Sequence, residues 1–106
     1  MLKNPEAIML LSEIERSKDS QIENLENLYL KEEIRIRMEF LGNTTSIKMS
    51  LCENNKEKEN ILQEYTEEME KIVAECQKRS EQIASRYEKK TKMLLERTEK
   101  EIKNIV

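Results

Sequence analysis

The sequence has very few of the residues that interrupt helices or that carry most enzyme chemistry. Its 106 residues include one Gly, one Pro, no Trp and no His. Gly and Pro are the strongest local signals for turns, so their scarcity excludes a loop-rich fold. Without His or a Gly-rich loop, nothing sets one of the many carboxylates apart as a catalytic acid or base. We therefore expect a protein that is not an enzyme and that holds no cofactor and no metal ion.

Cysteine is also scarce, and long apolar runs are missing. Cys52 and Cys76 form no C-x-x-C pair, and two thiols without a His make neither a zinc site nor a disulfide framework. No run approaches the length of a membrane span, and the start lacks the pattern of a secretory signal. These absences predict a cytoplasmic protein without membrane insertion, in which Asn43-Thr44-Thr45 is a polar turn rather than a glycosylation site.

Charge is plentiful but nearly balanced. Charged residues make up 39% of the chain and the net charge is −3, with 7 basic and 9 acidic groups in residues 1–52 and 12 and 13 in residues 53–106. Neither half has the basic patch that nucleic acids or anionic membranes require, so neither partner is expected. The abundance of Glu, Lys, Leu and Ile is typical of long helices. Disorder until a partner binds is the alternative, but regularly spaced apolar residues favour helix.

The signals for helix ends predict two long helices in a single elongated all-α domain, residues 1–106. Asn4-Pro5-Glu6 combines a capping residue, a first-turn Pro and an acidic first turn, so the first helix should span 5–41. Gly42 to Ser46 gathers the weakest helix formers of the chain, which predicts a break near 42–46 within a bend or short linker, 42–50. Ser50-Leu51-Cys52-Glu53 has the form of a capping box, which predicts a second helix over 51–106.

Apolar residues recur every eleven positions. In the second half the repeat is carried by Ile61, Ile72, Ile83, Leu94 and Ile105, and in the first half, more weakly, by Ile14, Leu25, Ile36 and Ile47. Eleven residues in three turns is about 3.67 per turn, which favours a straight or right-handed supercoil. We expect a hetero-coiled coil with a partner helix that shares this hendecad period. An ordinary bundle helix, with a period near 3.6, is the alternative.

The predicted partner interface is the apolar seam that this repeat creates. In the first half it comprises Leu11, Ile14, Ile22, Leu25 and Ile36. In the second half it comprises Ile61, Leu62, Tyr65, Met69, Ile72, Val73, Cys76, Ile83, Tyr87, Leu94 and Ile102. Both tyrosines are expected to lie in the seam with their hydroxyls at its edge, and Cys76 is expected to act as a small hydrophobe.

The stretch Ile8-Met9-Leu10-Leu11-Ser12-Glu13-Ile14-Glu15-Arg16-Ser17, the polar break and the long second helix resemble the peripheral-stalk proteins of rotary ATPases, in particular the G subunit of the V-type ATPase. In that family a long helix pairs with the N-terminal helix of the E subunit in a right-handed coiled coil. The resemblance implies a structural stator component of a proton-translocating complex, peripheral to the membrane, that binds the E subunit and resists rotational torque.

Two other structural roles remain open. Leu28-Tyr29 followed by Glu33-Ile34-Arg35-Ile36 resembles the helical N-terminal region of borealin, which implies a coiled-coil scaffold protein of a spindle or kinetochore complex. An antiparallel hairpin that folds back at Gly42, as in helical chaperones or adaptors, is the third possibility. All three roles bind protein and need no catalytic residue.

Overall fold

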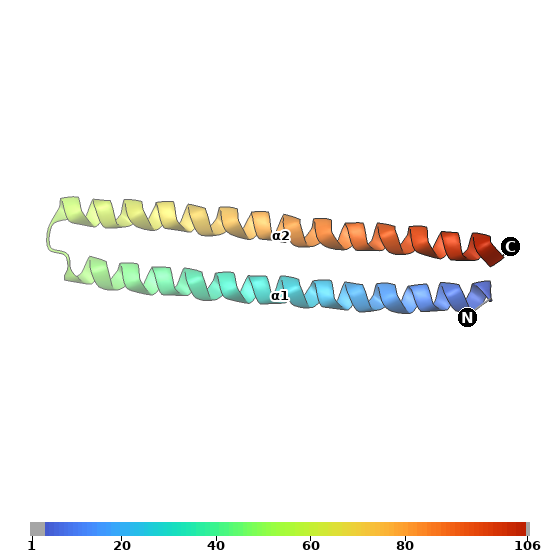
Figure 1. The fold of residues 1–106 in the computed structure, drawn as a ribbon. Coiled ribbons are helices and arrows are strands. Elements are labelled where there is room, and N and C mark those ends of the chain that lie inside the picture. Colours follow the sequence, from blue (N-terminus) through green and yellow to red (C-terminus); the bar gives the residue numbers. More distant parts are fainter. Residues whose placement is uncertain (1–3, 106) are drawn as a thin grey trace. The chain divides into compact units, whose positions relative to one another are not determined.

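The protein folds into two long helices joined by a three-residue turn. The structure, a computed structural model, describes residues 4–105. Helix α1 spans Pro5–Leu51 and helix α2 spans Asn55–Ile105, and these residues contain no strand (Figure 1). The prediction of an all-α chain built from long helices is confirmed.

Helix α1 begins where the capping signal predicted. The side-chain Oδ1 of Asn4 accepts a hydrogen bond of 2.9 Å from the backbone N–H of Glu6, one of the amides that the first turn leaves without a helical partner. Pro5 is the first helical residue, where its missing N–H costs nothing.

The predicted break at 42–46 is wrong, because α1 continues through this segment to Leu51. One Gly inside a helix costs only about 1 kcal/mol relative to Ala, and α1 has packed residues on both sides of it. Leu41 and Thr45 are half-buried, so helical packing continues across Gly42. The hydroxyl of Thr44 donates to the carbonyl of Phe40 at 2.9 Å, which satisfies this polar side chain within the helix.

The start predicted for the second helix is also wrong. Ser50 lies in the last turn of α1, where its hydroxyl donates to the carbonyl of Ile47 at 2.8 Å instead of capping a new helix. The turn is formed by residues 52–54, and α2 begins at Asn55. Its cap is Asn54, whose Oδ1 accepts a hydrogen bond of 2.9 Å from the N–H of Lys56. Asn54 thus repeats at α2 the capping contact that Asn4 makes at α1.

The helices pack against each other in two compact units. Unit 1 combines the part of α1 up to Asn27 with the part of α2 from Glu81 onward, and unit 2 is the continuous hairpin Leu28–Ser80. Within each unit the α1 segment lies antiparallel beside the α2 segment (Figure 1). The chain therefore folds back on itself, as the hairpin alternative proposed, but it does so at residues 52–54 rather than at Gly42.

The core of each unit is one line of side chains between two helices. The buried residues of unit 1 are Ile8, Tyr87, Leu94 and Thr98, and those of unit 2 are Leu30, Ile34 and Ile72. No side chain among the described residues is less than 2% exposed. Two helices alone cannot enclose a side chain completely, so each unit keeps a large area of its apolar side chains in contact with solvent.

Candidate protein-interaction surface

The seam of α2 follows the predicted eleven-residue repeat. Its buried and half-buried residues advance along the helix by three or four positions, and they include Ile61, Tyr65, Met69, Ile72, Cys76, Ile83, Tyr87, Leu94, Thr98 and Ile102. Positions eleven apart, such as Ile72, Ile83 and Leu94, share this inward face. The two other predicted seam residues of α2, Leu62 and Val73, are exposed beside it. The buried and half-buried residues of α2 thus keep the eleven-residue spacing as far as Ile102, whereas Ile105 is 37% exposed, and the surface they contact is α1 of the same chain.

In unit 1, helix α1 turns a mostly polar face toward α2. In unit 1 the inward residues from Ile8 onward are Ile8, Ser12, Glu15, Asp19, Glu23 and Glu26, of which only Ile8 is apolar. The predicted seam residues of α1, namely Leu11, Ile14, Ile22, Leu25 and Ile36, are all exposed. Their predicted role in a partner interface stays a prediction, and their side chains are accessible to another protein.

Ion pairs between the helices explain this orientation in unit 1. Arg97 of α2 pairs with Glu15 of α1 at 2.6 Å, and Arg86 pairs with Glu26. A step of eleven residues forward on α1 corresponds to eleven residues back on α2, so both pairs belong to one antiparallel register. These contacts need the acidic face of α1 to be inward, and its apolar residues consequently face away from α2.

Unit 2 contains two more interhelical pairs, and their polarity alternates. Glu33 of α1 pairs with Arg79 of α2, whereas four residues further on Arg37 of α1 pairs with Glu75 at 2.5 Å. The hydrogen bond from Arg37 holds the pKa of Glu75 below its ordinary value of 4.5. Sliding α2 by four residues would bring Arg37 opposite Arg79, so the alternation disfavours a shifted register.

Tyr87 is the residue of the seam with the most specific surroundings. It is 4% exposed, and Lys90 and Arg86 place their cationic groups 4.8 Å and 5.3 Å from its ring centroid. Its hydroxyl donates a hydrogen bond of 3.1 Å to Oε1 of Glu26. Burial, and secondarily the contact with Glu26, raises the pKa of Tyr87 above its ordinary value of 10.0. Tyr87 thus lies in the seam between α1 and α2 of the same chain, and its predicted role in a partner interface stays a prediction.

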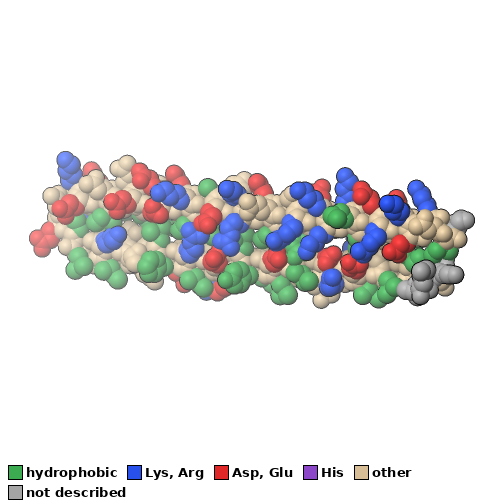
Figure 2. All heavy atoms as spheres, viewed as in Figure 1, with side chains coloured by type: hydrophobic (Ala, Val, Ile, Leu, Met, Phe, Trp, Pro, Cys, Tyr) green, Lys and Arg blue, Asp and Glu red, His purple; other side chains and the backbone are tan. Residues whose placement is uncertain are grey.

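In each unit, α1 leaves a row of apolar side chains exposed beside the face that contacts α2. We call these two rows of exposed side chains the α1 outer face. The row of unit 1 comprises Leu11, Ile14, Ile22 and Leu25, and the row of unit 2 comprises Tyr29, Ile36, Phe40, Ile47 and Leu51. In Figure 2 hydrophobic side chains gather along this edge of α1. Their exposed fractions range from 40% at Ile22 to 78% at Leu51. Exposed apolar patches that are much larger than a few hundred Å² mark interaction sites.

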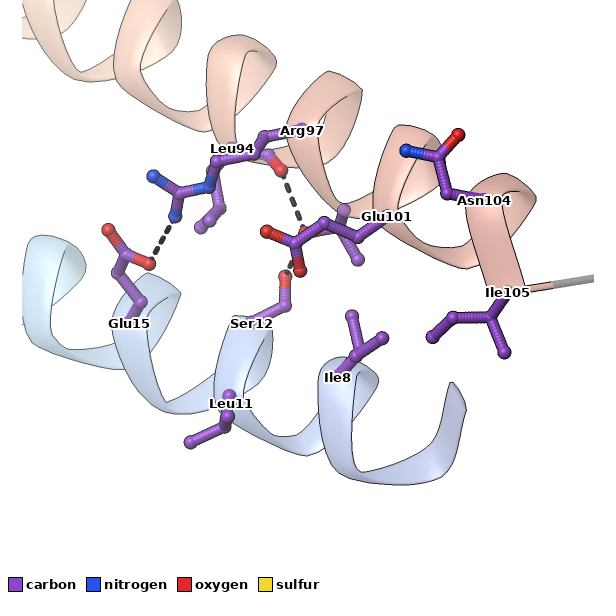
Figure 3. Close-up of a pocket in the computed structure, with 10 residues that line it drawn as sticks. Ile8, Leu11, Ser12, Glu15, Leu94, Arg97, Glu101, Asn104 and Ile105 are labelled. Carbon is purple, nitrogen blue, oxygen red and sulfur yellow. Dashed lines mark hydrogen bonds and ion pairs between the residues drawn. The ribbon is translucent and has the colours of Figure 1, made fainter. Parts of the chain in front are cut away.

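A groove of about 850 Å³ lies between the two helices in unit 1, close to the described ends of the chain. Figure 3 shows Ile8 and Ser12 pointing from α1 toward α2, and Leu11 also lines the groove. The hydroxyls of Ser12 and Thr98 share a hydrogen bond of 3.0 Å across the groove. No buried side-chain N or O atom in residues 4–105 lacks a hydrogen-bond partner, so nothing in the groove indicates a ligand. The groove is an open end of the helix pair.

The interhelical ion pairs are the feature that the sequence prediction missed. Their signal was present, because Glu15 and Glu26 are eleven residues apart, as are Arg86 and Arg97. This eleven-residue repeat in the charged residues marks the inward face of α1 in unit 1. Cys52 and Cys76 are half-buried and free of disulfides, with the thiol of Cys52 3.3 Å from a carboxylate oxygen of Glu57.

Comparisons with protein-family models, with curated proteins and with solved structures found no match for this chain. Neither α1 nor α2 contains, within residues 4–105, a segment apolar enough to cross a membrane. The same residues hold no cluster of three or more Cys, Asp or Glu side chains suited to a metal ion.

Proposed function

We propose that the protein is a non-catalytic assembly subunit that binds another protein through the α1 outer face. The observation that carries the proposal is the contrast between the two sides of α1. Its inward side makes ion pairs with α2, through Glu15 and Glu26 in unit 1 and through Glu33 and Arg37 in unit 2, while the α1 outer face is left exposed. A chain that folded to function alone would gain more by burying the apolar side, because burial stabilises by about 25 cal/mol per Å².

The helix pair serves as a platform in this proposal. The hydrophobic seam and the four interhelical ion pairs hold α1 beside α2 within each unit, so a partner meets a helix that is already formed. A preformed helix loses less conformational entropy on binding than a segment that must fold first. Helix-in-groove or helix-on-helix contact, with apolar anchors three and four residues apart, is the binding mode that suits this surface.

A stator component of a V-type ATPase remains the most specific form of the proposal, supported by the resemblance of residues 8–17 to the stalk family and by the eleven-residue repeat. Because α1 occupies the α2 seam, the N-terminal helix of the E subunit would contact the α1 outer face instead. A spindle or kinetochore scaffold would use the same face. The two forms differ in the identity of the bound protein, not in the surface.

The experiment that tests the proposal compares three tagged chains expressed in the source cells: the native protein, Phe40→Glu and Met93→Glu. Phe40 lies in the α1 outer face and Met93 lies outside it on α2, yet both are 69% exposed, so the two substitutions are matched. Proteins that co-purify with the native chain and with the Met93 variant, but not with the Phe40 variant, are partners of this face. Rotary ATPase components among them support the stator form, and segregation proteins support the scaffold form. Equal recovery from all three chains contradicts the proposal.

A further inference from the structure

We infer that the hairpin opens at the turn 52–54, so that α1 and α2 join into one helix whose single apolar stripe binds a helix of another protein. The inference rests on the proposed function, because the α1 part of this stripe is the α1 outer face. Three features of unit 2, the hairpin Leu28–Ser80, support it: the direction of its apolar residues, the conformation of the turn and the contacts that keep the hairpin closed.

The exposed row of α1 and the seam of α2 lie on one line of a continuous helix. Tyr29 and Tyr65 are 36 residues apart, and so are Ile36 and Ile72. At 3.6 residues per turn this separation is about ten complete turns, so both members of each pair would point in the same direction. In the hairpin Tyr29 and Ile36 are 70% and 53% exposed, whereas Tyr65 is half-buried and Ile72 is 6% exposed. Folding back thus covers the α2 half of the line and leaves the α1 half open.

The α2 half indicates which kind of partner the stripe binds. Its residues already pack along a helix, because the seam of α2 in unit 2 contacts α1. The α1 half continues the same line with the same spacing, so a helix fits it equally well. A partner helix would contact the exposed α1 half first. If it followed the stripe onto α2, it would displace α1 from the seam.

The turn contains nothing that prevents a continuous helix. Its residues are Cys52, Glu53 and Asn54, with neither the Gly nor the Pro that commonly ends a helix. None of residues 4–105 has a positive φ. The N–H of Cys52 donates to the carbonyl of Met49 at 3.4 Å, so α1 ends in a tightened turn rather than in a left-handed cap. All three residues can therefore adopt helical backbone angles without a steric penalty.

Opening exchanges a small apolar contact for a larger one. The buried residues of unit 2 are Leu30, Ile34 and Ile72. Leu30 and Ile34 would be exposed in the open helix, because they lie on a different side of α1 from the stripe. A partner helix would cover Ile72 again and would also cover the five side chains of the α1 row in unit 2, which are 53–78% exposed in the hairpin. The open complex would bury more apolar surface than the hairpin does.

The remaining contacts between the helices oppose opening only weakly. The side chains of Arg37 and Glu75, which pair across unit 2, are 40% and 44% exposed, and ion pairs in contact with water stabilise little. In unit 1 the inward face of α1 contributes one apolar side chain, Ile8. A partner helix therefore has few apolar contacts of α1 to replace.

The first test is a reversible lock on the hairpin. The hydroxyls of Ser12 and Thr98 lie 3.0 Å apart across the two helices, so Ser12→Cys with Thr98→Cys should form a disulfide that keeps α1 beside α2. Cys52 and Cys76 are changed to Ala in this chain and in a control that keeps Ser12 and Thr98. Both chains are oxidised and added to thiol-blocked extract of the source cells. We expect the oxidised lock to recover roughly tenfold less of the proteins that Phe40→Glu loses, because its binding-competent state is not populated. Reduction of the lock should restore recovery, and the control should not respond to oxidation.

The second test measures the opening itself. Spin labels replace Lys31 and Lys78, two exposed residues of unit 2, in the chain without native cysteines. In the hairpin the labels should lie within about 30 Å of each other, because packed helices are about 8–10 Å apart. In one continuous helix they would be roughly 70 Å apart, at about 1.5 Å per residue. We expect the short distance in the free chain and the long distance after the retained proteins have bound.

The outcomes separate this inference from the proposed function. Recovery by the oxidised lock equal to that of the control overturns opening, and so does a bound chain that keeps the short distance. In either case the loss of the same proteins from Phe40→Glu still supports the α1 outer face as a binding surface. If Phe40→Glu loses no protein, the proposed function and the inference both fail. Loss from the oxidised lock, recovery on reduction and the long distance together support the inference.

Discussion

The hydroxyl of Tyr87 on α2 donates a hydrogen bond of 3.1 Å to Glu26 on α1, while Arg86 pairs with the other oxygen of the same carboxylate. The carboxylate of Glu26 thus contacts two consecutive residues of the opposite helix, Arg86 and Tyr87. The phenol is buried and the carboxylate is half-buried, so the contact links the core of unit 1 to its charged edge. It also makes the stability of this unit sensitive to alkaline pH.

Tyr87→Phe should make the protein less sensitive to alkali. The pKa of Tyr87 is raised in the folded state, so its stabilising contribution is complete below its ordinary value of 10.0 and is lost as the pH rises through the higher folded value. Thermal melting followed by circular dichroism from about pH 8 to about pH 11 should show a steeper loss for the native chain than for the Phe variant. Tyr29→Phe, at an exposed tyrosine, is the control and should behave like the native chain. Parallel curves for all three chains would contradict this assignment.

Arg79→Glu should destabilise the helix pair, and a second change should reverse the effect. The substitution places a carboxylate against Glu33, and the charge-swapped double variant Glu33→Arg with Arg79→Glu restores an opposite pair. We expect a lower melting temperature for the single variant and substantial recovery for the double one, measured in low salt, where partly exposed pairs are least screened. Lys71→Glu, at a pair within α2, is the control and should have a smaller effect. Failure of the double variant to recover would show that the pair does not help to set the register.

Ile72→Ala should destabilise unit 2 far more than Val73→Ala. Ile72 is 6% exposed in the seam, while its neighbour Val73 is 50% exposed. Removing a buried Ile side chain costs about 2–5 kcal/mol, whereas truncating a half-exposed Val removes little packing. Urea unfolding of the two variants measures the difference in the free energy of unfolding. Similar losses of unfolding free energy in both variants would contradict the placement of Ile72 inside the seam and Val73 outside it.

Gly42→Ala should stabilise the protein by about 0.5–1 kcal/mol. Gly42 lies inside α1, and a methyl group added there would meet no atom within 4 Å. Ala costs less conformational entropy than Gly in a helix, and no clash offsets the gain. The midpoint of urea unfolding should rise without a change in slope. A variant less stable than the native chain would indicate that the helix does not continue through residue 42.

The helical content of the chain and the inward face of α2 could be predicted from local sequence. Asn4 and Pro5 specify the start of α1 because capping is a contact within one turn. The inward face of α2 followed from the spacing of Ile72, Ile83 and Leu94, because a side chain's angular position on a helix depends only on its residue number. The predicted boundary at Gly42 is wrong, because packing on both sides of one weak helix former outweighs its local cost.

The sequence by itself determined that this protein is two long helices with an eleven-residue apolar repeat, because helix propensity and periodicity are properties of neighbouring residues. Only the tertiary structure decided what fills the α2 seam and which side of α1 turns inward. That choice depends on contacts between residues as far apart as Glu15 and Arg97, which pair across the two helices. Those ion pairs turn the acidic side of α1 toward α2 and leave Ile14, Ile36 and Phe40 exposed on its other side.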